Sequence, residues 1–196
     1  MTTPLETRRD AIRRILLLTG AAMVGSQAFL RGESLAPTKS SSVFSDGEVA
    51  LLDEIGETIL PATHIPGAKD VKIGAFMAYM VTDCYTDDQQ AQFRVGLEAI
   101  DDASRGKFSQ GFVNCTAAQR TEILSAFDHE AHAVAAAHAG SENKPMHFFR
   151  MFKDLTLLGY FSSEIGCTQA IRYIEVPGYY RGDVPYKKGD PAWGTF

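Results

Sequence analysis

Cysteine is scarce in this chain of 196 residues, and the few cysteines present are not arranged to hold a cofactor. Cys84, Cys115 and Cys167 form no CxxC or CxxCH motif and lie at no metal-binding spacing from a histidine. This pattern argues against covalently attached c-type haem and against a zinc or iron–sulfur site. The chain also lacks GxGxxG and the P-loop motif, which excludes the two common nucleotide-binding loops.

Long hydrophobic runs, positive charge and β-alternation are also missing. The apolar stretch from Ile15 to Ala28 has about 14 residues, fewer than the roughly 20 that a membrane-spanning helix needs. The net charge is −5, and the chain after its first 35 residues is more acidic still, so nucleic acid is excluded as a partner. No alternation of useful length occurs, and the sequence therefore predicts an all-α fold.

The most informative feature that is present lies at the N-terminus. Arg8 and Arg9 precede the short, weakly hydrophobic stretch, a pattern typical of a twin-arginine signal, which exports folded proteins across the bacterial inner membrane. Ser26-Gln27-Ala28 offers a small-x-small cleavage site, and retention as an uncleaved anchor is the alternative. A short amphipathic helix on a cytosolic protein is a further interpretation. The order of the zones favours an exported, periplasmic protein.

The rest of the chain divides into a linker, one domain and an arm. About 150 residues follow the signal and the Ser/Thr-rich linker, which suits a single domain with a real core. The predicted boundaries are a signal region over 1–35, a linker over 36–44, a helical domain over 45–175 and an irregular Pro/Tyr-rich C-terminal arm over 176–196.

Apolar spacing predicts a series of helices within the domain. The first is capped by Ser45 or Asp46 and ends at Pro61. The others are expected over 73–85, where small residues allow a close neighbour, from Asp87 or Asp88 to a break over 106–111, from Thr116 through 139, over 146–161, and from 162 or 163 to 170. Phenylalanine, methionine and leucine cover more than half of the helix over 146–161, which is expected to be central and buried.

In an oxidising compartment, three cysteines are most simply one disulfide and one buried thiol. Spacing alone does not decide which two pair. We favour Cys84 with Cys115, because each lies near a predicted helix end or in a loop, whereas Cys167 lies inside an apolar helix.

Histidine and serine patterns offer only weak catalytic candidates. His129 and His132 stand at i and i+3, whereas the metalloprotease motif HExxH needs i and i+4. A metalloenzyme using this pair is a minor alternative to a solvated helix face. His147 is expected to be a satisfied, partly buried histidine. No serine has the Gly-x-Ser-x-Gly elbow of the α/β-hydrolases, and we therefore assign no catalytic, cofactor-binding or metal-binding residue.

Several segments together resemble one known family. The twin-arginine start, TDCY at 82–85, GYFSSEIG at 159–166 and the Pro/Tyr-rich tail over 176–186 are similar to the gluconate 2-dehydrogenase subunit 3 family. The resemblance covers about 45–193, and its most specific parts are GYFSSEIG and the tail.

The resemblance implies a cofactor-free small subunit of a membrane-associated sugar or sugar-acid dehydrogenase. It implies a large subunit whose flavin cofactor is FAD. In some complexes it also implies a third subunit that is a multihaem cytochrome c. The small subunit would hold the export signal and escort the large subunit, which has none. It would reach the membrane only through the complex or an uncleaved signal.

The arm then gains a role as a contact surface for the large subunit, because tyrosine and tryptophan are common interface anchors. The predicted interface residues are Tyr160, Phe161, Glu164, Tyr179, Tyr180, Tyr186 and Trp193. The alternative is that these aromatic side chains cover the domain's own helices. A free-standing exported module that binds a small ligand is the rival function.

Overall fold

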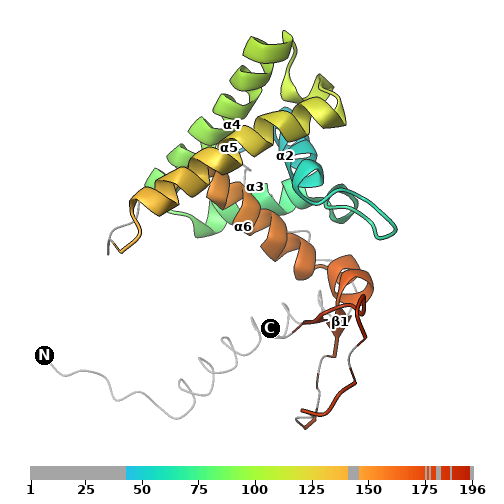
Figure 1. Ribbon diagram of the computed structural model, residues 1–196. Coiled ribbons are helices and arrows are strands. Elements are labelled where there is room, and N and C mark those ends of the chain that lie inside the picture. The colour runs from blue at the N-terminus through green and yellow to red at the C-terminus, as the bar shows by residue number, and fades with distance from the viewer. Residues whose placement is uncertain are drawn as a thin grey trace, which may run out of the picture. The chain divides into compact units, whose positions relative to one another are not determined.

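The computed structural model describes residues 43–140, 146–174, 176, 178–179, 182–185 and 187–194. This part of the chain is mostly helical, which confirms the predicted all-α class. Its elements, in chain order, are α2 (Asp46–Ile59), η1 (Lys69–Val71), α3 (Ile73–Cys84), α4 (Asp87–Phe108), η2 (Phe112–Asn114), α5 (Ala117–Ala137), α6 (Phe148–Phe161), η3 (Gly166–Ala170), β1 (Arg172–Tyr173) and β2 (Trp193–Gly194) (Figure 1).

Polar side chains determine where the helices begin. Three of the described helices start with a capping box, in which the N-cap hydroxyl and the side chain three residues later accept each other's backbone N–H; the pairs are Ser45 with Glu48, Thr86 with Gln89, and Thr116 with Gln119. The prediction that Asp87 or Asp88 caps α4 is wrong, because Thr86 takes that position. Both aspartates lie in the first turn, where their charge favours the helix dipole.

Two helix ends differ from the sequence prediction. Helix α4 continues through Gly106 to Phe108, and Ser109, with a left-handed φ of 58°, ends it. The short helix expected up to Ala170 contains a π-helical turn, η3, over Gly166–Ala170. Both differences lie at element ends, where local sequence signals are weakest.

Helix α6 is the core of the domain, as predicted. It contacts α2, α3, α4 and α5 (Figure 1). Phe152 is fully buried in its centre, and its ring centroid lies 4.2 Å from that of Phe93 on α4. Burial of one such side chain contributes about 1.5–3 kcal/mol. The hydroxyl of Thr156, also buried, donates to the Phe152 carbonyl at 2.7 Å, so this buried polar group is satisfied within the helix.

Helices α2 and α3 approach each other closely at Gly74. Its backbone N–H donates to Oδ1 of Asp53 on α2 at 2.7 Å, which satisfies a donor in the first turn of α3. A Cβ atom at this position would lie 2.4 Å from the Val49 carbonyl oxygen and 2.8 Å from the Asp53 nitrogen. The small residue therefore permits this contact, as the sequence predicts for the segment.

An ion-pair network, buried at Glu54 and Arg120 and exposed at Lys69, ties α2 to α5 and to the loop after α2. The Glu54 carboxylate contacts both Arg120 on α5 and Lys69 in η1, and the Glu54 and Arg120 side chains are only 12% and 18% exposed. Arg120 also donates to the carbonyl oxygens of Phe112 at 3.2 Å and Val113 at 2.8 Å. The charges are thus paired and hydrogen-bonded, as burial requires.

The described residues near the end of the chain include a pair of short strands that the sequence does not predict. Strand β1 pairs in parallel with β2, with Arg172 opposite Trp193 and Tyr173 opposite Gly194. Strand β1 also contacts η3, which in turn contacts α6. Strand β2 lies within the predicted Pro/Tyr-rich arm over 176–196, whose irregular character stays a prediction.

Among the described helices, none combines the length and apolar character needed to cross a bilayer.

Candidate functional site

Outside the helical core, several interactions converge on Arg172 at the place where β1 pairs with β2. The backbone N–H of Arg172 donates to the Ala192 carbonyl at 2.8 Å. Its guanidinium forms an ion pair with Asp190 at 2.8 Å, and its Cζ atom lies 5.4 Å from the centroid of the Trp193 ring. Arg172 thus contacts three parts of the returning chain through three kinds of interaction.

A tight turn places Asp190 for this contact. The Asp190 carboxylate accepts from the Lys187 backbone N–H at 3.2 Å, and the Asp190 N–H donates to the Lys187 carbonyl at 3.0 Å. Gly189 has a φ of 96° in this turn, a conformation that favours glycine. The hydrogen bond from Arg172, followed by that from the Lys187 backbone, lowers the pKa of Asp190.

The predicted interface residues separate into three groups: exposed residues, residues outside the described part of the chain, and residues that pack in or against the core. Glu164, Tyr179 and Trp193 are exposed, Tyr179 by 71% and Trp193 by 49%, as partner-binding side chains must be; their binding role stays a prediction. Tyr180 and Tyr186 lie outside the described residues. The same segment has further exposed apolar side chains that the sequence did not single out, namely Tyr173, Ile174, Val176 and Val184.

Tyr160 belongs to the core, and its assignment to the interface is corrected. It is only 5% exposed, and its hydroxyl donates to the Pro66 carbonyl at 2.7 Å. Burial raises the pKa of this phenol, and the carboxylates of Asp70 and Glu57 add to the increase. Phe161 is partly buried, packs against the core, and makes an edge-on contact with Tyr160.

The three cysteines are free in the structure, so the predicted disulfide between Cys84 and Cys115 is not formed. Cys84 is exposed at the end of α3, whereas Cys115 is buried and its thiol lies 3.6 Å from the Gly111 carbonyl. The Cys167 thiol contacts the Phe161 carbonyl at 3.1 Å. The two cysteines of the predicted pair therefore differ in solvent access.

Two of the histidines that the sequence analysis considers, His147 and His132, interact with neighbouring residues of the described chain. His147 caps α6, because its Nδ1 accepts from the Phe149 backbone N–H at 3.2 Å, as expected of a satisfied, partly buried histidine. His132 is exposed and lies 3.7 Å from Asp128. No group of three or more histidine, cysteine or acidic side chains among the described residues could hold a metal ion.

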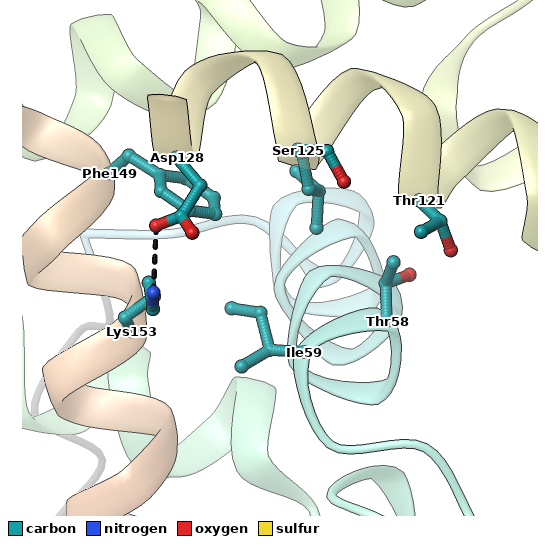
Figure 2. A pocket seen from close by; sticks show the side chains of 8 residues that line it. Thr58, Ile59, Thr121, Ser125, Asp128, Phe149 and Lys153 are labelled. Atoms are coloured by element: carbon teal, nitrogen blue, oxygen red, sulfur yellow. Dashed lines mark hydrogen bonds and ion pairs between the residues drawn. The ribbon is translucent and has the colours of Figure 1, made fainter. Parts of the chain in front are cut away.

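A hollow of about 220 Å³ lies between α2, α5 and α6 (Figure 2). Its lining is mixed: Thr58, Ile59, Thr121, Leu124, Ser125, Asp128, Phe149 and Lys153. Figure 2 shows the ion pair of Asp128 and Lys153 at one end, with Thr58 and Thr121 at the other. The Lys153 ammonium lies 2.7 Å from the Asp128 carboxylate, so the two charges of the hollow neutralise each other. The described side chains that line it therefore offer no free charge to orient a charged ligand.

The Asp128–Lys153 pair predicts a small loss of stability in acid. The hydrogen bond from Lys153 is the main cause that lowers the pKa of Asp128. A carboxylate with a lowered pKa stabilises the fold above its unfolded pKa of about 4 and loses this contribution as pH falls through the folded value. The Asp128 and Lys153 side chains are 35% and 32% exposed, so solvent weakens their interaction. We therefore expect Asp128→Asn to reduce the loss in free energy of unfolding between pH 7 and pH 3 by less than about 1 kcal/mol.

Urea unfolding between pH 7 and pH 3 measures this difference. Lys153→Met is the matched variant, because methionine has a similar length but no donor, so it removes the same hydrogen bond from the other side. An Asp128→Asn profile parallel to that of the wild type would contradict the assignment.

Comparison with known families decides where this chain belongs. The family model described as gluconate 2-dehydrogenase subunit 3 matches residues 46–178, which is more than half of the chain. The chain belongs to the gluconate 2-dehydrogenase subunit 3 family. This confirms the resemblance that the sequence shows. Neither a curated protein nor a solved structure matches the chain.

The match to the gluconate 2-dehydrogenase subunit 3 family begins with α2 and extends past β1. It therefore includes the whole helical domain and Arg172, whereas Asp190 and Trp193 lie beyond it. Membership indicates a subunit of an oxidoreductase complex. Arg8 and Arg9 lie outside both the match and the described residues.

Proposed function

We propose that this chain is a non-catalytic accessory subunit of a periplasmic, membrane-associated, flavin-dependent alcohol, sugar or sugar-acid dehydrogenase. It carries the twin-arginine signal at Arg8 and Arg9 and escorts and stabilises the flavin-bearing large subunit. The observation that carries the proposal is the match of residues 46–178 to a dehydrogenase subunit family.

The use of polar side chains within the domain supports an accessory role. Glu57 accepts from the backbone N–H groups of Ala62 and Lys69, both at 2.9 Å, and Asp70 accepts from Gly67 at 2.8 Å. Asp101 similarly accepts from the Phe112 N–H at 2.8 Å. These carboxylates accept hydrogen bonds from backbone N–H groups of loops, and their role is therefore to stabilise the loop conformations. The chemistry is therefore assigned to the large subunit and its flavin.

The C-terminal segment supports a protein partner in particular. Val176 and Tyr179 are 78% and 71% exposed, and Trp193 is half exposed beside Arg172. Aromatic residues and arginine are enriched at the anchor positions of protein interfaces. A small ligand would be better served by a concave apolar pocket, whereas the hollow in Figure 2 is small and its charges are paired.

Purification from the native membrane fraction tests the proposal. We expect an affinity tag on a flexible linker after Phe196 to bring down an equimolar flavoprotein with a flavin absorption spectrum. A haem spectrum in the same sample would identify a cytochrome c as the third subunit. A colourless, monomeric protein recovered from the soluble periplasm would overturn the proposal and favour the free-standing binding module.

A further inference from the structure

The described residues between β1 and β2 carry an unusual concentration of exposed apolar side chains. Ile174, Val176, Tyr179 and Val184 are 50%, 78%, 71% and 42% exposed; we call these four side chains the arm surface. All four lie between the two strands in sequence, and β1 and β2 pair with each other at the two ends of that stretch. Burying these side chains against a partner would be favourable, because it would remove apolar surface from water.

The strand pair alone is too short to hold that segment closed. It joins two residues to two residues, and even a full two-stranded hairpin is only marginally stable in water. Closing a segment of this length also costs chain entropy. Other interactions must therefore supply the stability, and they converge on Arg172.

Arg172 joins the two ends of the segment. From β1, its guanidinium contacts Asp190 just before β2 and lies over the ring of Trp193 within β2. Gly194 packs against the side chain of Ile171, and a Cβ atom there would lie 2.4 Å from Cδ1 of that residue. The three side chains of Arg172, Asp190 and Trp193 form what we call the arm clamp.

We propose that Arg172 is a positioning residue that pre-organises the arm surface for binding to the flavin-bearing large subunit. The inference rests on the proposed function, which supplies the partner. Each side chain or loop residue that must be ordered during association weakens binding, so a segment already closed at both ends binds more tightly than one tethered at β1 alone. Tyr179 then reaches the partner as a rigid aromatic anchor.

The proposal predicts that Arg172→Ala weakens binding without unfolding the helical domain. The probe is the flavoprotein that co-purifies with the wild-type chain, immobilised for interferometry. We expect the dissociation constant to rise about tenfold or more, while the thermal midpoint of the isolated chain is unchanged. Arg172→Lys keeps the charge but loses the planar group over Trp193, so an intermediate dissociation constant is expected.

Arg150→Ala is the matched control. Arg150 also pairs with an aspartate, Asp154, at 2.9 Å on an exposed helix face, but it takes no part in the clamp. Its removal is expected to leave the dissociation constant unchanged. An equal loss of binding in both variants would show a general effect of surface charge and would overturn the role of Arg172.

A double-mutant cycle with Tyr179→Ala separates positioning from direct contact. If Arg172 acts through the arm surface, the two substitutions together weaken binding by less than the product of their separate effects. Independent effects would show that Arg172 does not act through Tyr179 and would overturn the positioning role. Equal dissociation constants for wild type and Arg172→Ala overturn this inference alone, whereas a wild-type chain that captures no flavoprotein overturns the proposed function with it.

Discussion

Gly74→Ala is expected to destabilise the helical domain by about 3 kcal/mol, because the added methyl group has no space. Its carbon would lie 2.4 Å from the Val49 carbonyl oxygen and 2.8 Å from the Asp53 nitrogen. Both are backbone atoms of α2, so no rotation of a side chain relieves the clash. The helices must separate, which also lengthens the hydrogen bond from Gly74 to Asp53.

Thermal and urea unfolding of the full chain measure this effect. For a domain of about 150 residues, 3 kcal/mol corresponds to a fall in Tm of about 6–12 °C. Gly106→Ala in α4 is the control, because among the described residues no atom outside its chain neighbours and the adjacent backbone of its own helix lies within 4 Å of the place that its methyl group would take. This control should raise stability by about 0.5–1 kcal/mol. Equal stability of Gly74→Ala and wild type would show that α2 and α3 pack less closely than the structure indicates.

The helices and their caps could be predicted because their signals are local. Ser45 and Thr116 precede an acid or amide by three residues, and both are N-caps in the structure. Thr86 was missed because Asp87 and Asp88, which are also good caps, follow it directly. What decides between them is the reach of Gln89 back to the Thr86 N–H at 3.0 Å, and the T-x-x-Q pattern does contain that information.

Tyr160 shows how a local pattern can mislead about a site. It lies in a run that resembles the family and was therefore assigned to the partner interface. Its spacing from Phe149, Phe152 and Thr156 places it on the buried face of α6. The acceptor of its hydroxyl, the Pro66 carbonyl, is 94 residues away in the sequence, so the partner that makes this burial possible could not be predicted.

The arm clamp is non-local for the same reason. Two-residue strands show no periodicity, and the pairing of Arg172 with Trp193 joins segments that are separated in sequence. Composition indicates an aromatic arm, whereas only the structure identifies its anchor to the domain. The sequence spacing of Cys84 and Cys115 is equally uninformative about pairing, because it indicates neither the burial of the two thiols nor the distance between them.

Substitution of Arg8 and Arg9 by glutamine is expected to abolish delivery of the dehydrogenase to the periplasm. A twin-arginine signal is an address read by a receptor, so the guanidinium pair is required and hydrophobicity does not replace it. The prediction is measured by fractionating cells and assaying both subunits and the dehydrogenase activity in the periplasm and membrane. We expect both proteins to accumulate in the cytoplasm, and the activity outside it to fall to background.

The chain contains its own control for this experiment. Arg13 and Arg14 form a second arginine pair in the same segment, so their exchange for glutamine makes the same change in charge. If the Arg13/Arg14 variant is exported normally and the Arg8/Arg9 variant is not, then export depends on the position of the arginine pair and not on the net charge of the segment. Loss of export only in the Arg13/Arg14 variant would move the signal to that pair.

The location of the large subunit then tests the escort role separately from the signal. If this chain is the only carrier of the address, the flavoprotein remains in the cytoplasm with it, because a folded passenger crosses only while bound to a signal-bearing partner. A flavoprotein that reaches the periplasm while this chain stays behind would contradict escort and leave the signal assignment intact. Arg172→Ala leaves the signal intact but weakens binding to the flavoprotein. In this variant we expect this chain to reach the periplasm and the flavoprotein to remain largely in the cytoplasm.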